Sequence, residues 1–238
     1  MKNLQEQEVK ESLQIERSIY TSPIHRRSFL QFAGAGAAGM ALIAAGCKKD
    51  KNYNPMDGSV TLNFKDDLGI LNYAYALEQL EAAFYIQVVK TPYSGMPTNE
   101  MALLTDIRDH EVAHREFFKN ALATAAIAGL EVNFSKIDFA SRDSVLGTAK
   151  AFEDLGVSAY NGAGKLIKSA DYLTLAGKIV SVEARHAALI RDLISNGSFA
   201  DNTVVKANGL DTSRAPGEVL SIASGFIKTK INVTNLPS

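Results

Sequence analysis

Glu111-Val-Ala-His114 and Glu183-Ala-Arg-His186 are two copies of one Glu-x-x-His motif, and this repeat is the strongest indication of the fold. Residues three apart on a helix project from the same face, so the two side chains of each motif can reach one metal ion. A single glutamate precedes each copy in an apolar setting, Glu78 before the first and Glu153 before the second. Four carboxylates and two imidazoles from four helices are the ligands with which a helical bundle holds two metal ions. The expected metal ligands are Glu78, Glu111, His114, Glu153, Glu183 and His186.

Electrostatics favours a metal site over a purely structural role for these carboxylates. Four glutamates carry a formal charge of minus four, which two divalent ions neutralise. Without metal, the same cluster would place like charges in an apolar core, and some of the carboxylates would have to protonate. The plainer alternative is that each glutamate lies on the solvated face of an amphipathic helix. The repeated spacing argues for the metal site.

A tyrosine follows each single glutamate by seven residues, Tyr85 after Glu78 and Tyr160 after Glu153. These hydroxyls are candidates to donate hydrogen bonds to ligating carboxylates or to gate the site, a common role beside metal ligands. An ordinary place in the core, with the hydroxyl satisfied elsewhere, explains each tyrosine equally well. Glu81 lies on nearly the same helix face as Glu78 and is an alternative ligand or a neighbour of the ligands. The matching offsets to the two tyrosines favour Glu78.

The first motif also belongs to a longer pattern, His110-Glu111-Val-Ala-His114, which matches the signature of zinc proteases. In those enzymes both histidines bind zinc and the glutamate is the general base. The second copy has Val182 where a matching first histidine would stand. A protease would also need a third ligand downstream and would leave the second motif a coincidence. A zinc metalloprotease is therefore the minor alternative, and His110 is expected beside the ligands or at the surface.

Four long segments with apolar residues at helical spacing follow one another after the first quarter of the chain. They contain abundant alanine and no proline, which favours helix over strand. The expected helices span residues 67–90, 99–128, 141–166 and 170–195. The connection between the second and third helices is the longest, about a dozen residues, and is long enough to cross along the bundle. The sequence thus predicts an all-α four-helix bundle whose second and third helices run parallel, which is the ferritin-like topology.

The first 46 residues are predicted to be an export signal rather than part of the fold. Arg26 and Arg27 precede an apolar pair, as in twin-arginine signals, and an uncharged stretch rich in alanine and glycine follows. That stretch is too short for a transmembrane helix, which needs about 20 mainly apolar residues. Cys47 closes it and is expected to be the lipidated N-terminus left by lipoprotein-type cleavage. Ala44 stands where lipoproteins usually carry leucine, so ordinary cleavage that leaves a soluble periplasmic protein is the alternative.

The composition excludes several other kinds of site and partner. Cys47 is the only cysteine, which rules out a disulfide within the chain and any zinc or iron site built from cysteines. Basic and acidic residues nearly balance, at 25 Lys/Arg and 26 Asp/Glu, so nucleic acid is not an expected partner. The expected organisation is a tether over residues 47–65, the bundle over residues 66–197, and an extension over residues 198–238 that packs on the bundle.

Four stretches in the same order resemble the ferritin-like domain of the desiccation-related protein family, a branch of the ferritin-like superfamily. They are residues 71–85, 110–114, 153–160 and 182–186, and the resemblance extends over about residues 66–235. It implies a four-helix bundle with a dinuclear iron or manganese centre held by the six ligands named above. The chemistry of the superfamily includes ferroxidation, peroxide destruction and oxygen activation, so the fold does not select the reaction.

The leading hypothesis is an exported protein of the bacterial cell envelope, anchored through a lipid on Cys47, that acts on dioxygen, peroxide or iron during stress. Iron and manganese, cycling between divalent and trivalent states, suit mixed carboxylate and imidazole ligands better than a structural zinc does. Such a centre would make the protein an oxidoreductase of the ferroxidase, peroxidase or catalase type, and a homodimer is a further expectation. The alternative from another class is a non-catalytic bundle that binds or protects components of the envelope.

Overall fold

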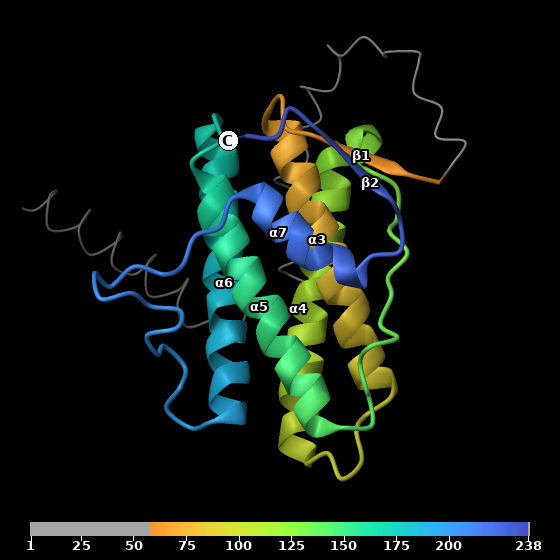
Figure 1. The fold of residues 1–238 in the computed structure, drawn as a ribbon, viewed down its shortest axis with the longest axis vertical. Helices are drawn as coiled ribbons and strands as arrows, with labels where there is room; N and C mark the ends of the chain where they lie inside the picture. The colour runs from red at the N-terminus through yellow and green to blue at the C-terminus, as the bar shows by residue number, and fades with distance from the viewer. Residues whose placement is uncertain (1–57, 238) are drawn as a thin grey trace, which may run out of the picture. The chain divides into compact units, whose positions relative to one another are not determined.

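The computed structural model describes residues 58–237. The predicted export motif at Arg26 and Arg27, the predicted lipidation site Cys47 and most of the expected tether lie outside these residues. Four long helices are followed by a shorter one, α7, and two strands pair with each other (Figure 1). The elements are β1 (Val60–Asn63), α3 (Asp67–Lys90), α4 (Thr98–Leu122), the 3₁₀ helix η2 (Ala123–Ala125), α5 (Arg142–Gly164), α6 (Ala170–Ile194), α7 (Pro216–Ala223), the 3₁₀ helix η3 (Ser224–Phe226) and β2 (Ile231–Thr234).

Three of the long helices begin where a side chain caps the first turn. The Asp66 carboxylate accepts a hydrogen bond from the Gly69 N–H at the start of α3. The hydroxyls of Ser141 and Ser169 accept from backbone amides in the first turns of α5 and α6. Caps of this kind satisfy amide groups that have no partner inside the helix. The sequence therefore fixes the starts of these helices through single polar residues.

The long helices form two hairpins, because α3 packs against α4 and α5 packs against α6. Residues 123–141 connect the hairpins and run along the bundle, so α4 and α5 are parallel (Figure 1). The prediction of an all-α four-helix bundle with a long crossover between its second and third helices is confirmed. The crossover is longer than expected because α4 ends at Leu122 instead of continuing to residue 128.

Asn72 explains why the chain leaves the axis of α4 so early. Ala123 adopts a φ of 48°, in the left-handed region, which turns the backbone away from the helix. The buried Asn72 side chain on α3 then donates to the Ala125 carbonyl at 2.9 Å and accepts from the Ile127 N–H at 2.8 Å. These two hydrogen bonds take the place of bonds that a longer α4 would have made.

The strand pair was not predicted from the sequence. β1 and β2 are parallel, with Val60 beside Ile231, and they join segments that lie far apart in the chain. β1 falls within the range expected to be a tether, yet its Leu62 is fully buried. The backbone leaving β1 passes close to α3, and a Cβ at Gly69 would lie only 1.6 Å from the Asn63 carbonyl oxygen. Only glycine fits at that crossing.

The C-terminal part of the described chain packs on the bundle through α7 and the segment before it. α7 contacts α5, and its Val219 and Ala223 are fully buried. The preceding segment touches α5 at Gly162, where a Cβ would lie 1.7 Å from the Arg214 carbonyl oxygen. Among residues 58–237, no helix combines the length and the apolar character that a membrane span requires.

Candidate metal centre

The six expected ligands come from all four long helices and meet in the interior of the bundle. α3 supplies Glu78, α5 supplies Glu153, and α4 and α6 each supply one Glu-x-x-His pair. All four glutamates are fully buried, with 0 % exposure, and the histidines are buried at 7 % for His114 and 4 % for His186. The alternative that these glutamates line a solvated helix face is therefore wrong.

The ligand atoms form two overlapping groups, and within each group they lie within 4.8 Å of one another. Glu111 and Glu183 belong to both groups, whereas Glu78 and Glu153 each belong to only one. The first group consists of Glu78, Glu111, His114 and Glu183, and the second consists of Glu111, Glu153, Glu183 and His186. Two carboxylates shared between two groups suit a pair of metal ions that both carboxylates bridge.

Each histidine faces the glutamate of the other motif. His114 Nδ1 lies 2.7 Å from Glu183 Oε1, and His186 Nδ1 lies 2.8 Å from Glu111 Oε1. His114 Nδ1 is also 3.5 Å from Glu78 Oε2, and His186 Nδ1 is 3.6 Å from Glu153 Oε2. The two halves of the centre are therefore arranged alike, as the doubled motif in the sequence predicts.

The two tyrosines predicted from their spacing donate to the single glutamates, and each does so across the bundle. Tyr85 on α3 donates to Glu153 Oε1 on α5 at 2.5 Å. Tyr160 on α5 donates to Glu78 Oε1 on α3. Burial and then the charge of the accepting glutamate raise the pKa of both tyrosines well above the usual range. Both hydroxyls therefore stay protonated and act as donors.

The remaining polar atoms of the centre make no hydrogen bond of good geometry among the described residues, although both histidines lie within ion-pair distance of a glutamate. Leaving such buried groups unpaired is costly. Carboxylate oxygens and imidazole nitrogens are ligands for iron and manganese, so bound ions would supply what these atoms lack. The atoms without a hydrogen bond of good geometry are Glu78 Oε2, both carboxylate oxygens of Glu111 and of Glu183, Glu153 Oε2, and Nδ1 of His114 and of His186. The residues present fit a metal pair.

Protonation of the metal-free centre follows from burial and charge. Burial and then the charge of Glu183 raise the pKa of Glu111 well above its usual range. Burial would lower the pKa of His114, but the charge of Glu78 and the contact with Glu183 raise it to about 11. Burial would raise the pKa of Glu183, but its contacts with both histidines lower it to about 2. Without metal, protons on the histidines and on some carboxyls thus balance the charge of the cluster.

Glu81 is buried next to the centre but belongs to neither group of ligand atoms among residues 58–237. Its carboxyl lies against α5 at Gly156, where a Cβ would be 2.8 Å from Glu81 Oε1. Burial and then the charges of Glu111 and Glu183 raise its pKa well above the usual range. Of the two glutamates that the sequence left open, Glu78 is therefore the candidate ligand and Glu81 lies beside the candidate ligands.

His110 touches the outer side of a candidate ligand. Its Nδ1 lies 2.9 Å from Nε2 of His186, and the two rings stack at 5.2 Å with an interplanar angle of 7°. Within the described part of the chain, His110 is in neither group of candidate ligand atoms. This geometry does not match a protease, in which His110 and His114 would bind one zinc ion. The contact with His186 was not evident from the sequence, since the two residues lie on different helices.

Comparison with known families agrees with this geometry. Residues 66–196 match the family described as ferritin-like domain, and residues 23–42 match the twin-arginine translocation pathway signal sequence. A comparison with curated proteins finds no match. The matched signal indicates export by the twin-arginine pathway to the cell envelope. The family match covers more than half of the chain and all six candidate ligands, and the chain therefore belongs to the ferritin-like domain family.

Proposed function

We propose that this protein is an exported dinuclear metal protein that carries out redox chemistry on dioxygen, peroxide or iron. The observation that carries the proposal is the convergence of four buried glutamates and two buried histidines, with two of the glutamates shared between the two groups of ligand atoms. Oxygen and imidazole donors in this combination suit iron or manganese. The protein would then be an oxidoreductase of the ferroxidase, peroxidase or catalase type.

The chain's own residues would keep such a centre fixed through a reaction. A bound pair of iron or manganese ions supplies one-electron steps between divalent and trivalent states. Glu111 and Glu183 would bridge the pair, and His114 and His186 would each bind one ion. Complete burial of the carboxylates keeps bulk water away from the ligands and strengthens every electrostatic interaction inside the site. The tyrosine hydroxyls would hold the two single glutamates in place.

For the location of the protein, we propose that Cys47 carries a lipid that anchors it to the membrane. We also propose that it belongs to the desiccation-related branch of the ferritin-like proteins and serves under stress. Replacing Arg26 and Arg27 by lysine should stop export, whereas Cys47→Ala should leave export intact and move the protein from the membrane fraction to the soluble fraction. A Cys47→Ala protein that stays with the membrane would exclude the lipid anchor.

Metal content tests the central proposal. We expect about two iron or manganese ions per chain, by elemental analysis, in protein made without its first 47 residues. A Glu111→Ala/Glu183→Ala variant should lose both ions, because it removes the carboxylates that both groups share. Turnover of dioxygen and of hydrogen peroxide would then be measured on the metal-loaded protein and on the variant.

Other outcomes point to other functions. A single zinc ion per chain would support the zinc metalloprotease. No metal after reconstitution with iron and with manganese would leave the non-catalytic bundle that binds or protects envelope components. A protein that binds two ions but shows no turnover with dioxygen, peroxide or iron would be a bundle that uses metal only for stability.

A further inference from the structure

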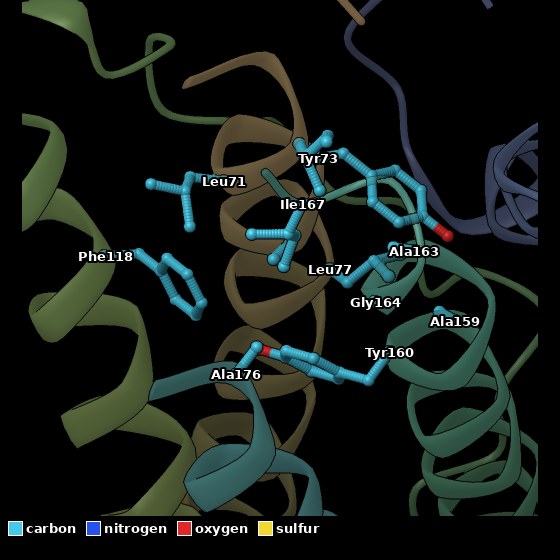
Figure 2. Close-up of a pocket in the computed structure, with 12 residues that line it drawn as sticks. Leu71, Tyr73, Leu77, Phe118, Ala159, Tyr160, Ala163, Gly164, Ile167 and Ala176 are labelled. Atoms are coloured by element: carbon cyan, nitrogen blue, oxygen red, sulfur yellow. The ribbon is translucent and has the colours of Figure 1, made fainter. Parts of the chain in front are cut away.

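A narrow cavity lies inside the bundle between α3, α4, α5, the turn after α5 and α6 (Figure 2). Its volume is ≈ 20 Å³, which is room for about one water-sized molecule. Among the side chains that line it, only Tyr73 and Tyr160 carry polar atoms, and the others are hydrocarbon or glycine. A hydrated metal ion or an organic substrate is too large for this space.

The cavity leads from the surface toward the candidate metal centre. Gly164, Ile167 and Ala176 line its outer part and are partly exposed. Leu77 and Tyr160 line its inner part and are buried, with 4 % and 8 % exposure. Figure 2 shows the Tyr160 ring reaching from α5 toward α3. The cavity is therefore open at one end and reaches a ring that touches the candidate metal centre at the other.

Tyr160 connects this cavity to the centre. Its ring lines the cavity, while its hydroxyl donates to Glu78, one of the six candidate ligands. Because the Tyr160 hydroxyl donates its proton to Glu78, it cannot donate a hydrogen bond to a molecule in the cavity. The Tyr73 hydroxyl has no hydrogen-bond partner within residues 58–237, and in Figure 2 it points in a different direction from that of Tyr160. A molecule in the cavity thus meets an almost wholly apolar wall next to the candidate metal centre.

We propose that this cavity is a binding site and access path for dioxygen. Dioxygen is apolar and small enough for the space, and it gives up no hydrogen bonds when it leaves water. Hydrogen peroxide and hydrated ions would lose most of their hydrogen bonds to water without finding replacements on this wall. The proposal deepens the proposed function, on which it rests, by naming dioxygen as the substrate that this path admits.

Dioxygen itself serves as the probe, in protein loaded with zinc, which is diamagnetic. Dissolved dioxygen is paramagnetic and speeds the relaxation of methyl protons that it approaches. We expect a stronger effect, measured by NMR under oxygen pressure, on the methyl groups of Leu77 and Ile167 than on those of Leu104 and Leu146. The latter two are fully buried and do not line the cavity, so they control for burial. Equal effects at all four residues would overturn the proposal.

A second experiment blocks the cavity with larger side chains. Ala176→Phe should fill the outer part, whereas Lys178→Phe places the same side chain at an exposed position on the same helix and is the matched control. Gly164→Leu is a second closing variant, since an added Cβ there meets only Leu173 Cδ1 at 3.8 Å, an ordinary contact. We expect both closing variants to lose the relaxation effect at Leu77 and the control to retain it.

The same variants, loaded with iron, separate this proposal from the proposed function. Oxidation by dioxygen should slow severalfold in Ala176→Phe and Gly164→Leu, with the metal content and the rate with hydrogen peroxide unchanged. An unchanged dioxygen rate, or an equal loss with peroxide, would overturn the path as a selective route for dioxygen. A protein that binds neither iron nor manganese would refute the proposed function, whereas the relaxation experiment would still decide whether dioxygen enters the cavity.

Discussion

The Tyr85 hydroxyl donates to Glu153 Oε1 across the bundle at 2.5 Å, and this bond directs the other carboxylate oxygen toward the centre. Glu153 Oε2 has no hydrogen-bond partner in the described part of the chain and lies 3.6 Å from His186 Nδ1. In the same way, the hydroxyl of Tyr160 on α5 donates to Glu78 Oε1 on α3. Each single glutamate is thus held through one oxygen while the other stays free to bind an ion.

Removing one of these donors should weaken metal binding without unfolding the bundle. Tyr160→Phe leaves Glu78 free to rotate, and loss of such an outer partner typically costs 10–100-fold in metal affinity. Competition with a chelator of known affinity measures the change. Tyr93→Phe is the matched control, because it also removes a bond from a buried tyrosine to a glutamate, Glu100, which is not a candidate ligand. Equal losses in the two variants would contradict the role of Tyr160.

A glutamate that belongs to one group of ligand atoms should affect the binding of one ion, and a glutamate shared by both groups should affect the binding of two. Glu78 belongs to one group of ligand atoms, so Glu78→Gln should lose one ion and keep the other. Glu111 belongs to both groups, and Glu111→Gln should impair the binding of both ions. Elemental analysis after gel filtration gives the stoichiometry. If Glu78→Gln and Glu111→Gln retain the same number of ions, the assignment of Glu111 as a bridging carboxylate is wrong.

Metal binding should release protons and should strengthen as the pH rises. The pKa of His114 is raised to about 11 and that of Glu111 is raised well above its usual range, so both groups hold protons at neutral pH in the metal-free protein. An ion must displace those protons, and they become harder to displace as the pH falls. Calorimetry with zinc in buffers of different ionisation enthalpy counts the protons. Affinity independent of pH across the neutral range would refute this prediction.

The loss of stability as the pH falls should depend partly on an ion pair between Glu100 in the first turn of α4 and Arg142 at the start of α5. Arg142 donates to Glu100 from Nη2 at 2.7 Å and from Nε at 3.0 Å, and this contact lowers the pKa of the carboxylate despite its burial. A lowered folded pKa means that the pair stabilises above the unfolded pKa of Glu100, and that this stability is lost as the pH falls through the folded value. Glu100→Gln should therefore lower the free energy of unfolding by about 1–3 kcal/mol at neutral pH and by less in acid.

Urea denaturation of the metal-free protein at both pH values measures this difference. Glu116→Gln is the control, since the Glu116 side chain is 40 % exposed and pairs with the partly exposed Arg115. Exposed pairs of this kind contribute about 0–1 kcal/mol. A Glu100→Gln protein whose deficit is the same at neutral and at acid pH would show that the charge of Glu100 is not the source of this stability.

The sequence was sufficient for the parts of the molecule that depend on helical spacing. The bundle and the convergence of the six candidate ligands both follow from residues three, four and seven apart on one helix. The tyrosines were candidates for the same reason. Which glutamate each tyrosine reaches was not predictable, because Tyr85 and Glu153 meet only after α3 and α5 have packed.

Contacts between distant segments account for what the sequence did not reveal. The end of α4 depends on Asn72, a residue on another helix, and the stacking of His110 on His186 joins α4 to α6. The strand β1 is too short to be recognised without its partner β2. Gly156 gives no signal of its own, although its missing side chain leaves room for Glu81. Sequence patterns within one helix or strand do not show which residues of other elements it will contact.

The pairing of β1 with β2 also imposes an order on biosynthesis. The amide of Val60 donates to the carbonyl of Lys230 at 3.0 Å, so this bond has to wait until the ribosome has made almost everything in between. Contacts of such long range close late and slow the completion of folding. The four long helices can assemble before β2 has been made, while β1 with its Leu62 still has no paired strand. A chain interrupted before Ile231 would therefore display an open strand edge, a mark by which cellular proteases and chaperones could tell unfinished molecules from finished ones.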